Sequence, residues 1–129
     1  MSLGGTELDG FDLGLPAASV RLLLPRPGAP DLAVPAWNGN EFLHADGTRP
    51  TIRTYTPRRH DPTHHELDID IVLHEHGAVP AWATAARAAD PAGLSGPGRG
   101  YTIDPSATSF LLLGDESAIP AISQLLEHL

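Results

Sequence analysis

The stretch that decides the fold is Glu66-Leu67-Asp68-Ile69-Asp70-Ile71-Val72-Leu73-His74. Every second residue of it is apolar: Leu67, Ile69, Ile71 and Leu73. In an extended chain, successive side chains point to opposite faces, so this period of two indicates a half-buried β-strand. We therefore predict a strand over residues 67–74, with one face on the core and with Asp68, Asp70, Val72 and His74 on the other.

Shorter apolar runs lie upstream of this strand, separated by prolines and glycines, of which the chain has 13 each. Residues 20–24 and 51–56 are predicted to be strands, because they are apolar or β-branched and each stops at a proline. Residues 26–50 are expected to be a loop with Trp37 and Phe42 as isolated anchors. This pattern of short apolar runs separated by prolines and glycines favours a mainly β fold over a helical bundle.

Downstream of the strand, Gly77 precedes an alanine-rich segment, predicted to be a short helix over residues 80–89 with Pro80 in its first turn. Residues 94–100 are glycine-rich and are expected to form a tight turn. They lack the Gly-Lys-Ser/Thr ending of a phosphate-binding P-loop.

The C-terminal part has a different texture. Residues 109–113 are continuously apolar, which is typical of a strand buried on both faces of a parallel sheet. Asp115 or Ser117 is expected to cap a following helix. The apolar face of that helix is predicted to contain Ile119, Ile122, Leu125, Leu126 and Leu129. We predict an antiparallel β-barrel-like domain over residues 1–104, followed by the first β–α unit of an α/β domain over residues 105–129.

Composition excludes several functions. The 129-residue chain has a formal charge of -8 and no cysteine. An acidic chain without a basic cluster is a poor nucleic-acid binder, and thiolate chemistry is excluded. No run approaches the roughly 20 apolar residues that a membrane-spanning helix needs, and the N-terminus lacks a secretory signal. A cytoplasmic location is the default expectation.

Arg53, Tyr55 and Thr56 are the first candidates for a binding site. A flavin dinucleotide needs a cation for its pyrophosphate, a flat partner for its rings and a polar group near its reactive edge. Taken alone, the four residues 53–56 fit an exposed arginine on a strand that carries a core tyrosine better than they fit a flavin site. The strand-to-helix turn at Gly77 offers uncapped N–H groups suited to a pyrophosphate, or is an ordinary turn.

The histidines raise the question of a metal site. Five of them lie between His60 and His76, but His64 and His65 are adjacent and would point to opposite faces of a strand. We expect a solvated loop over residues 60–65 and no metal site. Asp68 and Asp70 are expected to face solvent or a cofactor. His74 ends the polar face of the strand, where it can contact a bound cofactor.

Five segments in serial order resemble the siderophore-interacting protein family of ferredoxin-reductase-like flavoproteins. They are RTYTPRR (53–59), ELDIDIVLH (66–74), HGAVPAWA (76–83), SGPGRGY (95–101) and LLLGDESAIPAI (111–122). The resemblance implies an antiparallel β-barrel that binds FAD, followed by an α/β domain that binds NAD(P)H. It also implies that ferric siderophores are reduced through the flavin, with iron released in the cytoplasm.

The resemblance implies a cofactor-binding set and no catalytic residue or metal ligand. The set comprises Arg53, Tyr55, Thr56, Asp70, Val72, His74, Gly77 and Pro80. One departure lies beside the expected pyrophosphate, where family members show Pro-Ala-Ser and this chain has Ala78-Val79-Pro80. Pro80 has no backbone N–H, so anion binding there is expected to be weaker.

The resemblance also implies truncation at both ends, with the first barrel strands and most of the nicotinamide domain missing. We expect the chain alone to be inactive, and the open barrel edge to favour a homodimer. Two alternatives stay open: a non-catalytic binding module, and a related flavoprotein with another electron acceptor.

Overall fold

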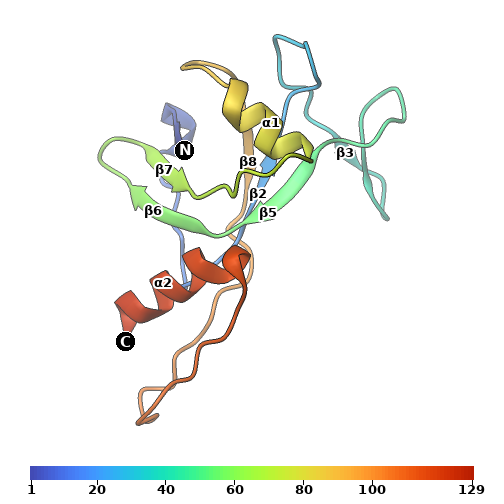
Figure 1. Cartoon of the computed structure of the whole chain (residues 1–129). Coiled ribbons are helices and arrows are strands. Elements are labelled where there is room, and N and C mark those ends of the chain that lie inside the picture. The colour runs from blue at the N-terminus through green and yellow to red at the C-terminus, as the bar shows by residue number, and fades with distance from the viewer. The chain divides into compact units, whose positions relative to one another are not determined.

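The computed structural model describes residues 1–129, and its strands pair in antiparallel fashion (Figure 1). The strands are β1 (Ser2–Gly4), β2 (Val20–Leu23), β3 (Ala36–Trp37), β4 (Phe42–Leu43), β5 (Ile52–Tyr55), β6 (Pro57–Asp61), β7 (Glu66–Ile69) and β8 (Gly93–Ser95). The α-helices are α1 (Ala78–Ala85) and α2 (Ile119–His128), and two 3-10 helices cover Thr6–Leu8 and Glu116–Ala118. The predicted mainly β class is confirmed, and no barrel closes.

The chain divides into two compact units, which are described separately. The first contains residues 1–20, 55–72 and 96–129, and the second contains residues 21–54 and 73–95. None of the helices has the length and apolar character that crossing a membrane requires. The predicted domain boundary at residue 104 stays a prediction.

The first unit is built on the sheet β1-β7-β6. Leu67 and Ile69 of β7 are 0% and 1% exposed, as their alternation predicts. Leu3 of β1 lies opposite Leu67, while β6 and β7 form a hairpin. The tight connection between them places His65 at φ 53, a left-handed conformation.

The strand predicted over residues 67–74 ends early, at Ile69. On both sides of β7 the last pairing partner lies opposite Ile69. On one side this partner is Pro57 of β6. On the other side it is Met1, whose N-terminal amine donates to the Ile69 carbonyl and whose carbonyl accepts from Ile69 N. Beyond this point the chain has no ladder partner, and Leu73 is 63% exposed. The apolar alternation predicts a strand correctly only where partner strands are present.

The second unit is built on the sheet β5-β2-β8, in which Leu22 is fully buried. Residues 93–95, expected to be part of a turn, form β8 and pair with β2 in the register Leu22 opposite Leu94. The expected loop over residues 26–50 contains the β3–β4 hairpin, where the rings of Trp37 and Phe42 lie 5.0 Å apart. These strands form through pairing with distant residues, and the local glycine and proline content does not predict them.

Helix α1 spans residues 78–85, rather than the predicted 80–89. Its start moves to Ala78, so Pro80 is the third helical residue, still within the first turn, where a missing N–H is tolerated. Its end comes at Ala85 because Ala86 is extended. Val79 and Pro80 are its buried residues.

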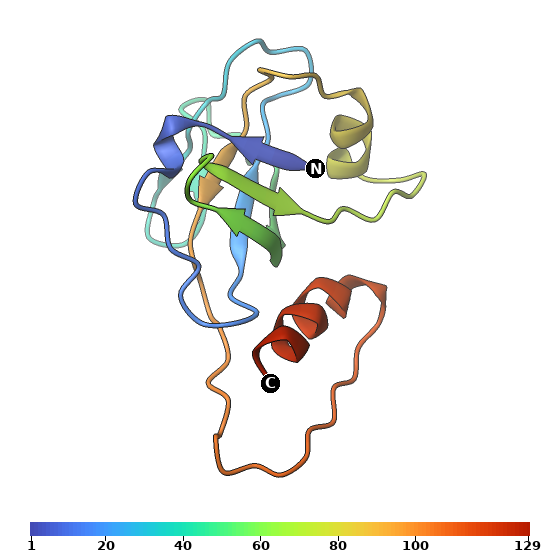
Figure 2. The ribbon, with the colours of Figure 1, turned by 90° about the vertical axis from the view of Figure 1, so that its left-hand side faces the viewer.

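The strand predicted over residues 109–113 does not form. Leu111 and Leu113 are each 82% exposed, and Figure 2 shows this part of the chain as a loop that leads to α2. A strand buried on both faces needs neighbouring strands on each side and covering layers, and this chain pairs nothing with residues 109–113.

Helix α2 is confirmed, but the predicted cap is displaced: the Asp115 carboxylate accepts a hydrogen bond from Ser117 N at 3.0 Å and caps the 3-10 helix Glu116–Ala118, while the N-cap of α2 itself is Ala118, without a side-chain cap. Its predicted apolar face is partly wrong, since only Ile122 and Leu125 of that face are half-buried. Ile119, Leu126 and Leu129 are exposed, whereas the buried residues of the helix are Pro120 and Gln124. The helix therefore packs against its own unit through a polar residue.

Candidate functional site

Arg53 lies on β5 and is exposed. Its Nη1 donates to the carbonyl of the preceding residue, Ile52, at 2.8 Å, and it forms no ion pair with a carboxylate. A guanidinium without an acidic partner has most of its N–H donors available for an external anion. Arg53 is thus chemically suited to a phosphate group.

The turn before α1 is tight. Gly77 has φ 119, and a Cβ there would lie 3.1 Å from His74 Cε1 and 3.3 Å from Pro80 Cδ. Glycine is needed because this backbone conformation is nearly closed to other residues and the space is already filled. The structure thus brings together three residues of the predicted set: His74, Gly77 and Pro80.

The first turn of α1 carries no side-chain cap, since Gly77 offers none. Uncapped N–H groups at a helix start attract anions through partial positive charge. Pro80 contributes no N–H and is buried, so fewer donors are available than in a helix with a polar residue there.

Tyr55 and Thr56 follow Arg53 and are half-buried, at the end of β5. Asp70 and Val72 lie beyond the end of β7, where the chain is exposed and has no strand partner. Asp70 is close enough to Arg58 to contribute, after the larger effect of Glu127, to the raised pKa of the Arg58 guanidinium. The surface beyond β7 is therefore open, as a cofactor-facing segment requires.

The expected solvated loop over residues 60–65 is partly wrong. His60 belongs to β6, its ring lies edge-on to Phe11 with centroids 5.4 Å apart, and its Nε2 is buried without a hydrogen-bond partner. His64 is exposed and pairs with Asp61 at 2.8 Å, which raises the pKa of the imidazole. No three His, Asp or Glu side chains converge into a group that could hold a metal ion.

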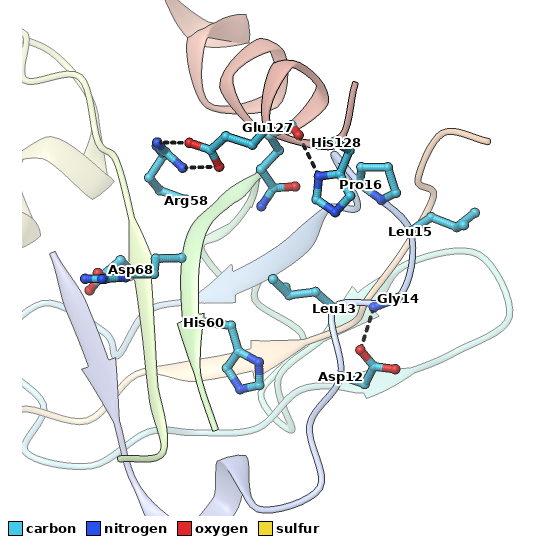
Figure 3. Close-up of a pocket in the computed structure, with 12 residues that line it drawn as sticks. Asp12, Leu13, Gly14, Leu15, Pro16, Arg58, His60, Asp68, Glu127 and His128 are labelled. Atoms are coloured by element: carbon cyan, nitrogen blue, oxygen red, sulfur yellow. Dashed lines mark hydrogen bonds and ion pairs between the residues drawn. The ribbon is translucent and has the colours of Figure 1, made fainter. Parts of the chain in front are cut away.

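Sequence reasoning missed a cavity of about 720 Å³ in the first unit. It lies among the loop of residues 12–16, β6 and the end of α2 (Figure 3). On one side of it Arg58 and Glu127 form a two-point ion pair, with N–O distances of 2.6 and 3.1 Å. A local sequence pattern does not predict a contact between residues that are 69 positions apart.

Gln124 is the other residue that the sequence did not single out. It lines the same cavity and is 6% exposed. Its Oε1 accepts a hydrogen bond from Ala17 N at 2.7 Å, and its Nε2 donates to the carbonyl of Pro57. The sequence offered one indication of this role in packing, which is that a glutamine stands among the apolar positions of the predicted helix.

Antiparallel strands, an unpaired arginine on β5 and a glycine turn into an uncapped helix define the class: a domain suited to bind a dinucleotide cofactor. The profile of the siderophore-interacting FAD-binding domain matches residues 1–101. The chain belongs to this family of FAD-binding domains, and the resemblance found in the sequence is confirmed.

Known relatives agree along the whole chain. The NADPH-dependent ferric-chelate reductase of Escherichia coli is 35% identical over 128 residues, which are 98% of this chain and 49% of that protein. The ferric vibriobactin reductase of Vibrio cholerae is 32% identical over 130 residues, covering 48% of its length. The chain spans about half the length of these relatives.

Solved structures of siderophore proteins are also similar to this chain over nearly its whole length. A siderophore utilization protein from T. fusca matches 99% of this chain and 49% of its own, with a TM-score of 0.79 and 34% identity. A siderophore-interacting protein from Aeromonas hydrophila matches with a TM-score of 0.70 and 32% identity.

The residues present fit FAD. The dinucleotide carries a doubly charged pyrophosphate, for which Arg53 has a guanidinium without a carboxylate partner and the start of α1 has N–H groups without a side-chain cap. Its ring system needs an aromatic partner, and Tyr55 is an aromatic residue two positions after Arg53. The substitution at Pro80 removes one donor and leaves the rest of the donor set in place.

Proposed function

We propose that this chain is the FAD-binding portion of an NAD(P)H-dependent ferric-siderophore reductase that releases iron in the cytoplasm. The single observation that carries the proposal is Arg53, an exposed arginine without a carboxylate partner on the strand that ends in Tyr55. The reductase names of two relatives supply the reaction class.

We infer that Arg53 binds the pyrophosphate, because guanidinium and phosphate form short charge-assisted hydrogen bonds. The Gly77 turn and the start of α1 supply backbone N–H groups to the same phosphates, with Pro80 as the weak point. His74 borders this turn, because its Cε1 lies 3.1 Å from the place that a Cβ of residue 77 would occupy. These residues bind and orient the cofactor.

Tyr55 is proposed to stack on the isoalloxazine and Thr56 to hydrogen-bond its reactive edge. Asp70 and Val72 are proposed to border the cofactor from the open segment beyond β7. When bound, the flavin accepts hydride and passes single electrons to iron(III). The protein's part is position, electrostatics and exclusion of water.

NAD(P)H and a ferric siderophore are proposed as the reactants of the whole protein rather than of these 129 residues. The support is the length relation, since the reductases that this chain matches are about twice as long. We expect the chain alone to bind FAD and to lack turnover.

The test is a visible absorption spectrum of the purified chain before and after adding FAD and removing the excess. Flavin bands retained near one equivalent, and lost in Arg53→Ala, support the site. The matched control is Arg21→Ala, which removes an exposed arginine without an ion pair from the neighbouring strand β2. Retention that is the same in both variants would contradict the role of Arg53.

A homodimer through a free strand edge is a further proposal. β1 is three residues long and lies at the edge of its sheet, and an unpaired edge is a template for another chain. Light scattering over a range of concentrations checks it. Gly4→Pro removes an N–H that faces the free edge, because the hydrogen-bonded positions of the β1–β7 ladder are Met1, Leu3 and Gly5. It is expected to weaken a dimer built on this edge, whereas Leu111→Asp is expected to leave it intact.

A further inference from the structure

Gln124 is an unusual residue for the position that it holds. It is buried, while Ile119 and Leu126 of the same helix, and Leu129 just after its end, are exposed. Burying a side-chain amide costs free energy unless both of its ends are hydrogen-bonded. Both ends of Gln124 are bonded, each to the backbone of a different segment, so the residue links three parts of the unit.

The first link fixes the loop before β2. Gln124 Oε1 accepts from Ala17 N at 2.7 Å, and Ala17 has φ 56. The left-handed conformation is unfavourable for a residue with a Cβ, so it persists where surrounding contacts hold it. The hydrogen bond from Gln124 is such a contact, and both residues are buried.

The second link reaches a β-bulge. Pro57 and Arg59 of β6 lie opposite the consecutive residues Ile69 and Asp68, so Arg58 is an extra residue in the ladder. Gln124 Nε2 donates to the carbonyl of Pro57, the buried residue that begins the bulge. One turn further along α2, Glu127 holds the extra residue, Arg58, by their ion pair (Figure 3).

The bulge comes directly after Tyr55 and Thr56. Pro57 is the first residue of β6 and follows Thr56 directly in the chain, so the place that the bulge gives to Pro57 constrains the short segment that carries Tyr55 and Thr56. Two hydrogen-bonded side chains of α2, three positions apart, hold this bulge in one state.

We propose that Gln124 is a positioning residue: by holding the Pro57 carbonyl it fixes the bulge, and thereby the direction of Tyr55 and Thr56 toward the flavin. The inference rests on the proposed function for the flavin contacts and goes beyond it in naming a residue of α2, outside the matched residues 1–101. Gln124 acts through the backbone and does not touch the cofactor.

Two variants of the full chain test this role. Gln124→Met keeps the length and flexibility of the side chain and removes both hydrogen bonds. Gln124→Glu, ionised, keeps the acceptor for Ala17 N and removes the donor to Pro57. Losing one net hydrogen bond corresponds to about a tenfold change in an equilibrium constant. We expect both variants to bind FAD about tenfold more weakly.

The decisive readout is the environment of the bound flavin at saturating FAD. Visible circular dichroism and flavin fluorescence report how the ring system sits against Tyr55. We expect both signals to change in the two variants and to stay unchanged in Leu126→Gln, which places the same amide on the exposed side of α2. Thermal unfolding of each protein without FAD measures the purely structural effect separately.

Three outcomes separate the hypotheses. Changed flavin signals in both Gln124 variants support the positioning role. A lower melting temperature with unchanged signals and affinity overturns it, because Gln124 then serves stability alone. A wild-type chain that retains no FAD overturns the proposed function, and the positioning role with it. If Gln124→Met does not fold, Gln124→Glu, which keeps one of the two hydrogen bonds, decides the test.

Discussion

Arg58 and Glu127 form an ion pair across 69 positions of the sequence, with Nη2 and Oε1 2.6 Å apart. The pair joins the bulge of β6 to the last turn of α2, and it lies beside the cavity of the first unit. The guanidinium lowers the pKa of the Glu127 carboxyl, chiefly through their hydrogen bonds. The side chains are 36% and 54% exposed, so water competes for both charges.

Removing this ion pair is expected to change stability little. Exposed pairs contribute weakly because solvent and salt screen them and because two long side chains must be ordered. Glu127→Gln should therefore shift the melting temperature less than Gln124→Met, which leaves buried backbone groups without partners. Thermal unfolding followed by circular dichroism compares the two. A larger shift for Glu127→Gln would show that the charge, not the buried amide, holds α2.

A core substitution in the second unit should be far more harmful. Leu22 is fully buried in the central strand of β5-β2-β8, and Leu22→Ala is expected to lower the free energy of unfolding by about 2–5 kcal/mol. The matched control, Leu111→Ala, alters a leucine that is 82% exposed and should stay within about 0.5 kcal/mol of wild type. Urea unfolding of both proteins measures the difference.

Gly77 should tolerate alanine poorly. The substitution places a Cβ in a backbone of φ 119 and within 3.1 Å of His74 Cε1, so a loss of about 2–3 kcal/mol is expected, together with weaker FAD retention. Gly28→Ala is the control, since Gly28 has φ 76 but nothing within 4 Å of its Cβ position. Equal losses in the two variants would mean that backbone strain alone, and not the contact with His74, matters.

The stability contributed by the turn that joins β6 to β7 should depend on pH. Asp61 raises the pKa of His64, and His64 lowers the pKa of Asp61, in both cases first through their side-chain hydrogen bond. The contribution of His64 is full below its unfolded pKa and is lost as the pH rises through its raised folded value. The contribution of Asp61 is present above its unfolded pKa and is lost as the pH falls through its lowered folded value.

The pair is thus fully effective only between these two limits. Nuclear magnetic resonance titration of His64 in wild type and in Asp61→Asn measures the effect. We expect the imidazole to titrate at a lower pH in the variant, because its carboxylate partner is gone. A titration curve that does not move would contradict the ion pair seen in the turn.

Part of this architecture is readable from local sequence. Alternation of apolar residues at Leu67 and Ile69 predicts β7 because a pleated strand presents every second side chain to the core. Asp115 predicts that helical structure begins directly after it, since its carboxylate accepts from the N–H of Ser117 in the 3-10 helix that leads into α2. Five segments in serial order, rather than the motif around Arg53 alone, predict the family, and the family model matches residues 1–101.

Other parts depend on which partners the chain meets. β7 stops at Ile69 although the alternation continues, because Met1 and Pro57 are the last partners on its two sides. Residues 109–113 have the composition of a buried strand and stay unpaired. Residues 93–95 have the composition of a turn and pair with β2. Backbone hydrogen bonds between strands are non-local, so composition alone does not determine them.

The sequence by itself therefore determined the class of this protein, the family and the residue types suited to FAD, because these follow from periodicity and from the chemistry of single side chains. Tertiary structure alone decided the ends of the strands, the face on which α2 packs and the burial of Gln124 between two backbone partners. The reason is physical: the apolar period of a helix indicates which side can be buried, but a buried amide is stabilised by partners that only the folded chain supplies, here Ala17 and Pro57.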